Sequence, residues 1–390
     1  MIYNCIIIRY GELTLKGKNK NDFIDCLYQN VKKCLNDFST IIKIEKQYDR
    51  CYIHYEDENI VDDILKRLEN ISGISSFSLA TKIDKEIEKI KEISLLQVNN
   101  NDKNYHTFKV VASRNDKTFP IISDQINREV ASTILKNTDF KVDVHNPDVK
   151  IRIEIRKDGA YISTEKIEGL GGFPLGIGGK GLLMISGGID SPVAGFLMMK
   201  KGVKIEAIHF SSPPYTSDMA VFKVKTLLKE LAKIQGKIKF YNVPFTNLQL
   251  EIYKNCGDSY AITIMRRMMY RIADIIAKKN KCSCIINGES VGQVASQTLE
   301  SMKVINEVSN NLIIRPLAVM DKLEIINIAT KINTYATSIL PYEDCCTIFD
   351  PKSPVTKPKL ENCHYLESKF DYQTLISECL ENITCEEISL

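Results

Sequence analysis

The sequence lacks the features that would place the protein in a membrane or outside the cell. No run among its 390 residues approaches the ~18 consecutive apolar residues that a membrane-spanning helix needs. The N-terminus has no basic segment before its strand-length apolar stretch, so we expect no signal peptide. Twelve cysteines are too few for a disulfide scaffold, and without secretion they are expected as reduced thiols. These absences predict a cytoplasmic protein with no membrane partner.

Two common nucleotide-binding motifs are also missing. The formal GxGxxG within residues 176–181 precedes an expected strand, whereas a dinucleotide fingerprint follows a strand and opens a helix. Lys180-Gly181 is not followed by the Ser or Thr of a Walker A motif. The vicinal pair Cys345-Cys346 does not have the spacing of a zinc half-site.

The composition is that of an ordinary globular protein, with 44% hydrophobic and 26% charged residues, which excludes a disordered or collagen-like chain. The net charge is only +3, but residues 180–281 hold 17 basic and 7 acidic side chains. A positive block suits a nucleotide or another polyanion. For single lysines such as Lys223 and Lys225, a solvated helix face is the simpler interpretation.

The chain length predicts two or three domains at roughly 150 residues each. Residues 1–75 and 76–167 each alternate strands and helices and predict two small α+β domains, followed by a Gly-rich linker at 168–181. In 182–390, we expect strands at 182–185, 203–210, 237–243, 282–287 and 312–314, and helices at 192–201, 217–235, 260–279 and 322–332. Such alternation predicts an α/β domain with a doubly wound parallel sheet, whose ligands bind at the carboxyl ends of the strands.

A glycine-containing loop at residues 186–191 connects the first of these strands to a helix. Gly187 and Gly188 permit a sharp turn that brings backbone amides close to an anion. Pro192 is suited to the first turn of the helix, whose positive N-terminal end faces the same point. This pattern predicts a phosphate-binding loop; a purely structural turn is the alternative.

The polar side chains of the loop extend this prediction. Ser186 and Ser191 supply hydroxyl donors for a phosphate. Asp190 would repel the phosphate unless a cation lies between them, so its presence predicts Mg²⁺.

The loop and several later segments resemble a known family. Residues 186–194 (SGGIDSPVA) resemble the PP-loop of the ATP pyrophosphatases, which adenylate a substrate and release pyrophosphate. Residues 265–271, 287–297, 320–326 and 340–346 follow in an order similar to that of the tRNA 4-thiouridine synthetase (tRNA sulfurtransferase, ThiI) family. Residues 76–167 resemble its THUMP RNA-binding domain, and residues 1–75 its ferredoxin-like domain.

The resemblance implies a set of ATP contacts, which fall on Met184, Ile185, Ser186, Gly187, Gly188, Ser191, His209, Phe210, Arg266, Gly288 and Gln297. Several of these end expected parallel strands, where a nucleotide can bind. By charge alone, Arg267 is as good a phosphate partner as Arg266. A core histidine is the alternative for His209, and a helix surface for Gln297.

The resemblance also implies the catalytic groups. Asp190 would hold Mg²⁺ through the phosphates, and Lys322 would stabilise the transition state or the leaving pyrophosphate. Cys346 would carry a persulfide, while Cys345 could be a spectator, a second sulfur carrier or a disulfide partner. The roughly 30 residues after Pro358 are too few for the rhodanese domain of longer members, so we expect sulfur directly from a cysteine desulfurase.

The expected reaction therefore has two half-steps. ATP adenylates the C4 oxygen of uridine 8 in tRNA, and the persulfide sulfur on Cys346 then displaces AMP to give 4-thiouridine. The family also implies sulfur transfer to the ThiS carrier in thiamine thiazole synthesis, and pairing into homodimers. The alternatives are another PP-loop tRNA-modifying enzyme, such as a 2-thiouridylase, and a non-catalytic THUMP RNA-binding protein.

Overall fold

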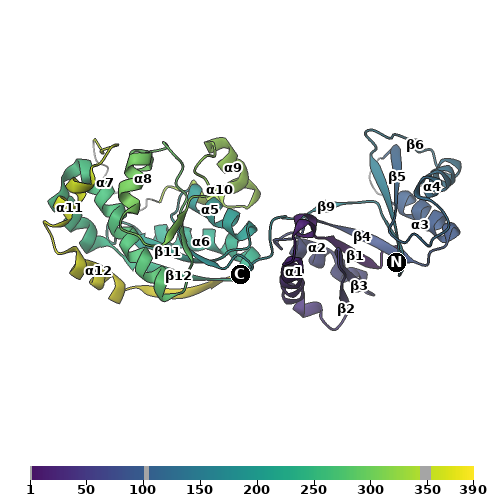
Figure 1. The fold of residues 1–390 in the computed structure, drawn as a ribbon, viewed down its shortest axis with the longest axis horizontal. Coiled ribbons are helices and arrows are strands. Elements are labelled where there is room, and N and C mark those ends of the chain that lie inside the picture. Colours follow the sequence, from purple (N-terminus) through teal and green to yellow (C-terminus); the bar gives the residue numbers. More distant parts are fainter. Residues whose placement is uncertain (1, 101–104, 343–352) are drawn as a thin grey trace. The chain divides into compact units, whose positions relative to one another are not determined.

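The computed structural model describes residues 2–100, 105–342 and 353–390 (Figure 1). The chain divides into two compact units, Met1–Pro174 and Leu175–Leu390. Within the described ranges, none of the helices combines the length and the apolar character that spanning a bilayer requires.

One continuous sheet forms the framework of the first unit. Across the sheet, its strands are β2 (Ile42–Lys46), β3 (Arg50–Tyr55), β1 (Cys5–Arg9), β4 (Ser76–Ile83), β8 (Gly159–Ser163), β7 (Val149–Arg156), β5 (Thr107–Arg114) and β6 (Lys141–Val142), with β9 (Ile167–Glu168) paired to β4. The helices of this unit are α1 (Lys20–Cys34), α2 (Val61–Leu68), α3 (Ile87–Asn99) and α4 (Ser123–Asn137). The first two pack with the β1 half of the sheet and the last two with the β5 half.

Strand β4 joins the two halves of this sheet. Its first five residues pair with β1, as in Ser76 opposite Arg9, and its last three pair with β8, as in Ile83 opposite Ala160. The sequence pattern predicts neither β4 nor α3. In β4 the reason is that residues on both faces are buried, Ser76 and Ser78 among them, so the expected alternation of apolar and polar residues is lost.

The second unit contains the doubly wound parallel sheet that the sequence predicts. Its strand order is β14 (Leu312–Ile314), β13 (Cys284–Ile286), β10 (Lys180–Met184), β11 (Lys204–Ser211), β12 (Lys237–Pro244) and β15 (Thr384–Ser389). Neighbours pair in parallel except β12 and β15, which are antiparallel. The sequence pattern does not predict edge strand β15, because Ile388 is its only buried residue and its apolar pattern is weak.

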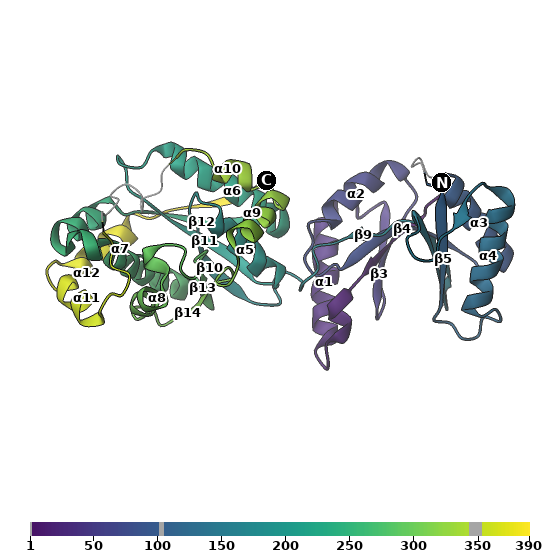
Figure 2. The same cartoon turned by 90° about the horizontal axis from the view of Figure 1, so that it is seen from above.

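Helices cover both faces of this sheet (Figure 2). One face carries α5 (Asp190–Lys200), α6 (Asp218–Gln235), α9 (Lys322–Lys331) and α10 (Tyr335–Ser338). The other carries α7 (Thr246–Lys279), α8 (Leu299–Asn306), α11 (Leu360–Glu367) and α12 (Tyr372–Glu381). The core lies largely under α7, where Ile264, Met268 and Ile272 are fully buried and each contributes about 1.5–3 kcal/mol.

Two helix starts differ from the predictions. The helix expected from residue 260 begins at Thr246, with a break at Gly257, whose φ of 65° is a left-handed conformation that glycine adopts easily. The segment before the break buries Leu248 and Ile252, whose four-residue spacing is a helical signal. The helix expected from residue 192 begins at Asp190, so a carboxylate lies in its first turn, where the helix dipole favours it.

Candidate functional site

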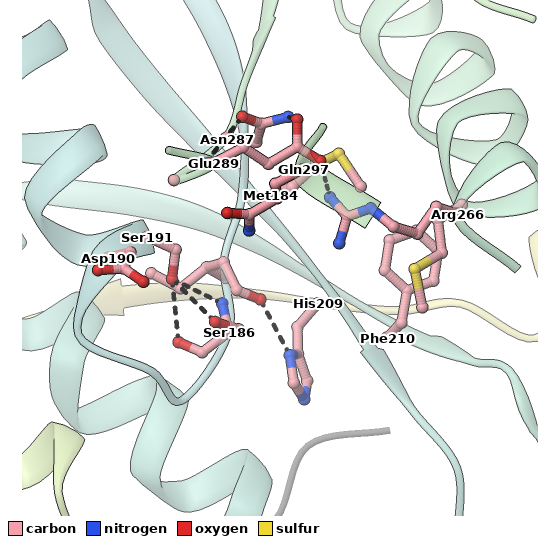
Figure 3. A pocket seen from close by; sticks show the side chains of 13 residues that line it. Met184, Ser186, Asp190, Ser191, His209, Phe210, Arg266, Asn287, Glu289 and Gln297 are labelled. Carbon is pink, nitrogen blue, oxygen red and sulfur yellow. Dashed lines mark hydrogen bonds and ion pairs between the residues drawn. The ribbon is translucent and has the colours of Figure 1, made fainter. Parts of the chain in front are cut away.

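A pocket opens at the carboxyl ends of three neighbouring parallel strands, β13, β10 and β11 (Figure 3). Its lining consists of Met184, Ile185, Ser186, Asp190, Ser191, His209, Phe210, Arg266, Met269, Asn287, Gly288, Glu289 and Gln297. The pocket thus brings together the expected ATP contacts except Gly187 and Gly188, which lie in the adjoining loop. Its position is the one expected for a ligand of a doubly wound sheet.

The loop between β10 and α5 is held closed by its two serines. The backbone N–H of Ser186 donates to Ser191 Oγ at 2.9 Å, and Ser191 Oγ lies 3.2 Å from both Ser186 Oγ and the Ser186 carbonyl oxygen. The N–H of Gly188 is 3.3 Å from Ser186 Oγ. The serines therefore fix the shape of a turn that leads directly into the N-terminal end of α5. The positive end of the helix dipole and the free backbone N–H groups at that end suit an anion.

Gly288, the second residue after β13, lies in close contact with the start of α5. A Cβ atom at this position would lie 2.7 Å from the Asp190 carbonyl carbon and from the Ser191 backbone nitrogen. Real Cβ atoms essentially never come that close to backbone atoms, so a larger residue would displace the helix start or the strand end. The close approach explains why a glycine is needed here.

Asp190 makes an ion pair at the edge of the pocket. Its Oδ1 lies 2.7 Å from Lys322 Nζ, and its Oδ2 accepts a hydrogen bond from Gln293 Nε2 at 3.2 Å. Lys322 occupies the first turn of α9, which Asp321 and Glu324 cap reciprocally. The structure therefore places the expected acidic and basic groups together.

A buried carboxylate orients the arginine of the pocket. Glu289, only 3% exposed, forms an ion pair with Arg266 (Figure 3). It forms a second ion pair with Arg315, whose Nε lies 2.6 Å from Glu289 Oε2. Burial alone would raise the pKa of Glu289, but the charges of Arg266 and Arg315 outweigh burial and hold this pKa below its usual range. The three side chains carry one net positive charge beside the pocket, which suits an anionic ligand.

The sequence prediction leaves out Glu289, Asn287 and Met269, which also line the pocket. Asn287 Nδ2 donates to Glu289 Oε2 at 2.9 Å and so helps to hold the buried carboxylate. The available signal is the position of Asn287-Gly-Glu289 directly after the β13 strand, where polar residues commonly face a ligand.

Charge alone does not distinguish Arg266 from Arg267 as a phosphate partner, but their positions in the structure do. Arg267 is fully buried, with its Nε 2.6 Å from Glu367 and its Nη2 2.9 Å from Glu307, so it supports the packing of α7 with other helices. Arg266 instead lines the pocket.

His209 and Gln297 also reach the pocket. His209 is buried, and its Nδ1 lies 3.0 Å from the Ile185 carbonyl oxygen, so it connects the ends of β10 and β11 while lining the cavity. Gln297 ends a short 3-10 helix, where its Oε1 accepts from the Ser290 N–H at 3.3 Å. Its side chain is therefore not on an exposed helix surface.

The expected sulfur carrier, Cys346, and its neighbour Cys345 lie outside the described residues. Among the described cysteines, burial raises the pKa of Cys282 and of Cys363 to about 11, so both are inert packing residues near neutral pH.

No group of three potential metal ligands occurs among the described His, Cys, Asp and Glu side chains. A Mg²⁺ ion bound by one carboxylate and substrate phosphates nevertheless fits Asp190, because Mg²⁺ usually takes few protein ligands at such sites.

Comparisons with known proteins show which family the chain resembles. The family model described as thiamine biosynthesis protein (ThiI) matches residues 176–372, the ThiI ferredoxin-like domain matches residues 5–78, and the THUMP domain matches residues 80–165. A protein named "Probable tRNA sulfurtransferase" from Geobacillus sp. (strain WCH70) is 50% identical over 98% of this chain and 95% of its own length. A protein of the same name from Brevibacillus brevis is 46% identical, and the match covers 100% of this chain and 97% of that protein.

A solved structure is also similar over nearly the whole chain. The crystal structure of a 4-thiouridine synthetase in complex with RNA and with bound ATP is 39% identical, with a TM-score of 0.90, and the match covers 99% of this chain and 100% of that one. This similarity confirms the fold class expected from the sequence.

Proposed function

The chain belongs to the family of thiamine biosynthesis protein (ThiI), and from this membership we propose how it acts as an ATP-dependent tRNA sulfurtransferase that forms 4-thiouridine. The observation that carries the proposal is the position of the Ser186–Ser191 loop, which forms one wall of the pocket beside the Asp190–Lys322 ion pair. A phosphate-binding turn, a carboxylate and a lysine together fit the activation of an oxygen by ATP.

In the first half-reaction, the C4 oxygen of uridine attacks the α-phosphate of ATP, and pyrophosphate leaves. The loop amides and the N-terminus of α5 hold the phosphates, while Arg266 adds a positive charge that Glu289 keeps in place. Lys322 stabilises the negative charge that develops on the transferred phosphate. Asp190 is the residue that would hold Mg²⁺, which would neutralise further negative charge on the phosphates.

The second half-reaction exchanges oxygen for sulfur. The outer sulfur of a Cys346 persulfide attacks C4, and AMP leaves with the former carbonyl oxygen. A second thiol then attacks the Cys346 sulfur, which releases 4-thiouridine and leaves a disulfide for a thiol reductant to reduce. A carbonyl oxygen is a poor leaving group, which is the physical reason that ATP is required.

The first unit binds the tRNA substrate through its THUMP domain, which is the RNA-binding module of the family. We further propose a cysteine desulfurase as the source of the persulfide sulfur. Four further points stay predictions: uridine 8 as the target, sulfur transfer to ThiS, pairing into a homodimer and a cytoplasmic location.

The test separates the two half-reactions. The protein is incubated with ATP, Mg²⁺, unmodified tRNA, a cysteine desulfurase and cysteine, and pyrophosphate and 4-thiouridine, the products of the first and the second half-reaction, are measured. We expect both products from the natural sequence, and pyrophosphate with no thionucleoside from Cys346→Ser. Cys385→Ser, at an exposed thiol on β15, is the matched control and should retain both products. Loss of both products in Cys346→Ser, or of neither, would contradict the role given to Cys346.

A further inference from the structure

Lys223 on α6 is a buried lysine that the proposed chemistry does not use. The sequence favours a solvated helix face for it, but its exposed fraction is 5%. Its neighbour Lys225 does lie nearer the surface, in an ion pair with Glu386 of β15. Burying an ammonium group costs free energy, so the position of Lys223 needs a structural or functional reason.

The side chain of Lys223 touches the phosphate-binding loop. A Cβ atom built on Gly187 would lie 3.1 Å from Lys223 Cδ, 3.3 Å from its Cε and 3.4 Å from its Nζ. The lysine therefore packs directly against the glycine turn, and any shift of Gly187 must be accommodated by the side chain.

The same ammonium group holds a second segment. Lys223 Nζ donates a hydrogen bond to the carbonyl oxygen of Leu340 at 2.7 Å, just after α10. A parallel link joins these regions, because Ser338 Oγ donates to the Gly188 carbonyl oxygen at 3.3 Å. The two adjacent glycines of the loop are thus connected to residues 338–340.

Residues 338–340 are close in sequence to the proposed nucleophile. Leu340 precedes Cys346 by six residues, which span at most about 20 Å when fully extended. The backbone that contacts the loop is therefore the backbone that leads into the cysteine pair.

We propose that Lys223 is a positioning residue that couples occupancy of the loop by a nucleoside triphosphate to the segment that precedes Cys346. Binding of phosphate orders Gly187 and Gly188, and Lys223 and Ser338 transmit that ordering to residues 338–342. By linkage, the ordered segment in turn favours the bound nucleotide. This inference rests on the proposed function, since it requires ATP in the pocket.

Hydrogen exchange of the full-length protein, with and without a non-hydrolysable ATP analogue and Mg²⁺, tests the coupling. In the natural sequence, the analogue should slow exchange in peptides covering 284–297, which line the pocket, and 335–342, the latter about tenfold, within the usual range of couplings between sites. In Lys223→Met, protection of 284–297 should remain, while that of 335–342 should fall to the part that Ser338 still transmits. Lys223→Arg, which keeps the charge and the donors, should restore part of it, and Lys225→Met should behave as the natural sequence.

The outcomes separate the inference from the function on which it rests. Equal protection of 335–342 in the natural sequence and in Lys223→Met would overturn the coupling, while the nucleotide site would stand. No protection of 284–297 in the natural sequence would instead contradict the proposed function. Ser338→Ala removes the parallel link without touching the lysine, so it tests the coupling even where Lys223→Met fails to fold. It should weaken the protection of 335–342.

A product measurement complements the exchange experiment. If Lys223 positions the segment that precedes Cys346, adenylation should continue in Lys223→Met, but water should hydrolyse more of the adenylated uridine before sulfur attacks it, so that more AMP is released for each 4-thiouridine made. We expect the ratio to rise several-fold, whereas a general loss of stability would lower both products together. An unchanged ratio would overturn the role in positioning.

Discussion

Lys322 Nζ lies 2.7 Å from Asp190 Oδ1 and joins the first turns of two helices that are 132 residues apart in sequence. In this arrangement each group keeps the other in place at the edge of the pocket. A triphosphate with its metal ion offers both groups a stronger partner, since the carboxylate prefers the cation and the ammonium prefers the phosphate. We therefore propose that the ion pair is a resting form of two groups that have separate roles when ATP is bound.

Lys322→Met should lower the rate of pyrophosphate formation by about 10²–10³ while changing the KM for ATP little, because the lysine acts mainly on charge that develops in the transition state. Steady-state kinetics of pyrophosphate release, with tRNA, a cysteine desulfurase and cysteine present, checks this. Lys331→Met, at the last turn of the same helix, is the control and should keep the natural rate. A large rise in KM with an unchanged kcat would show that Lys322 serves ground-state binding instead.

Gly288→Ala should weaken ATP binding by at least tenfold, or about 1.4 kcal/mol, because its Cβ would push against the start of α5. Equilibrium binding of ATP and of tRNA is the measurement, and tRNA affinity should be unaffected. Gly17→Ala is a suitable control, since a Cβ there meets nothing within 4 Å. Unchanged ATP affinity in Gly288→Ala would mean that the pocket tolerates a shift of the helix start.

Glu289→Gln should destabilise the second unit near neutral pH by about 3–5 kcal/mol, because it leaves Arg266 and Arg315 without their buried carboxylate. The pKa of Glu289 is lower in the folded protein than its ordinary value of 4.5, so ionised Glu289 stabilises the fold above that value. This contribution is lost as the pH falls through the lowered pKa.

Thermal unfolding followed from pH 7 downward tests this expectation. The difference in Tm between Glu289→Gln and the natural sequence should be largest near neutral pH and should shrink in acid. Glu378→Gln, at an exposed position on α12, should show no such difference. A Tm gap that widens as the pH falls would mean that the sign assigned to the Glu289 pKa is wrong.

The loop and the strand ends could be predicted because their information is local. Residues 186–191 follow one another directly, and the strands before the pocket have clear apolar patterns. The environment of Glu289 could not be predicted in this way, since its partners Arg266 and Arg315 are 23 and 26 residues away. Only the packing of α7 against the sheet brings these charges together.

The burial of Lys223 could not be predicted either, because it too depends on residues that are distant in the sequence. A lysine on an amphipathic helix is normally solvated, and nothing in its neighbours indicates otherwise. It is buried because α6 and the segment after α10 enclose it beside the loop, as its bond to the Leu340 carbonyl oxygen shows. The start of α7 is a different case, because its helical spacing is present in the sequence but the glycine at 257 favours an end rather than an interruption.

Strand β4 sets a practical limit on dissecting the first unit. Ser76–Ile83 is hydrogen-bonded to both β1 and β8. A fragment that stops at residue 75 therefore leaves β1 without this partner, and a fragment that starts at residue 84 leaves β8 without it, so each has an unpaired strand edge. Such edges recruit other chains and promote aggregation. A fragment that ends at Pro174 keeps all the strand pairings of β4. Studies of RNA recognition on isolated fragments should therefore begin with the intact first 174 residues.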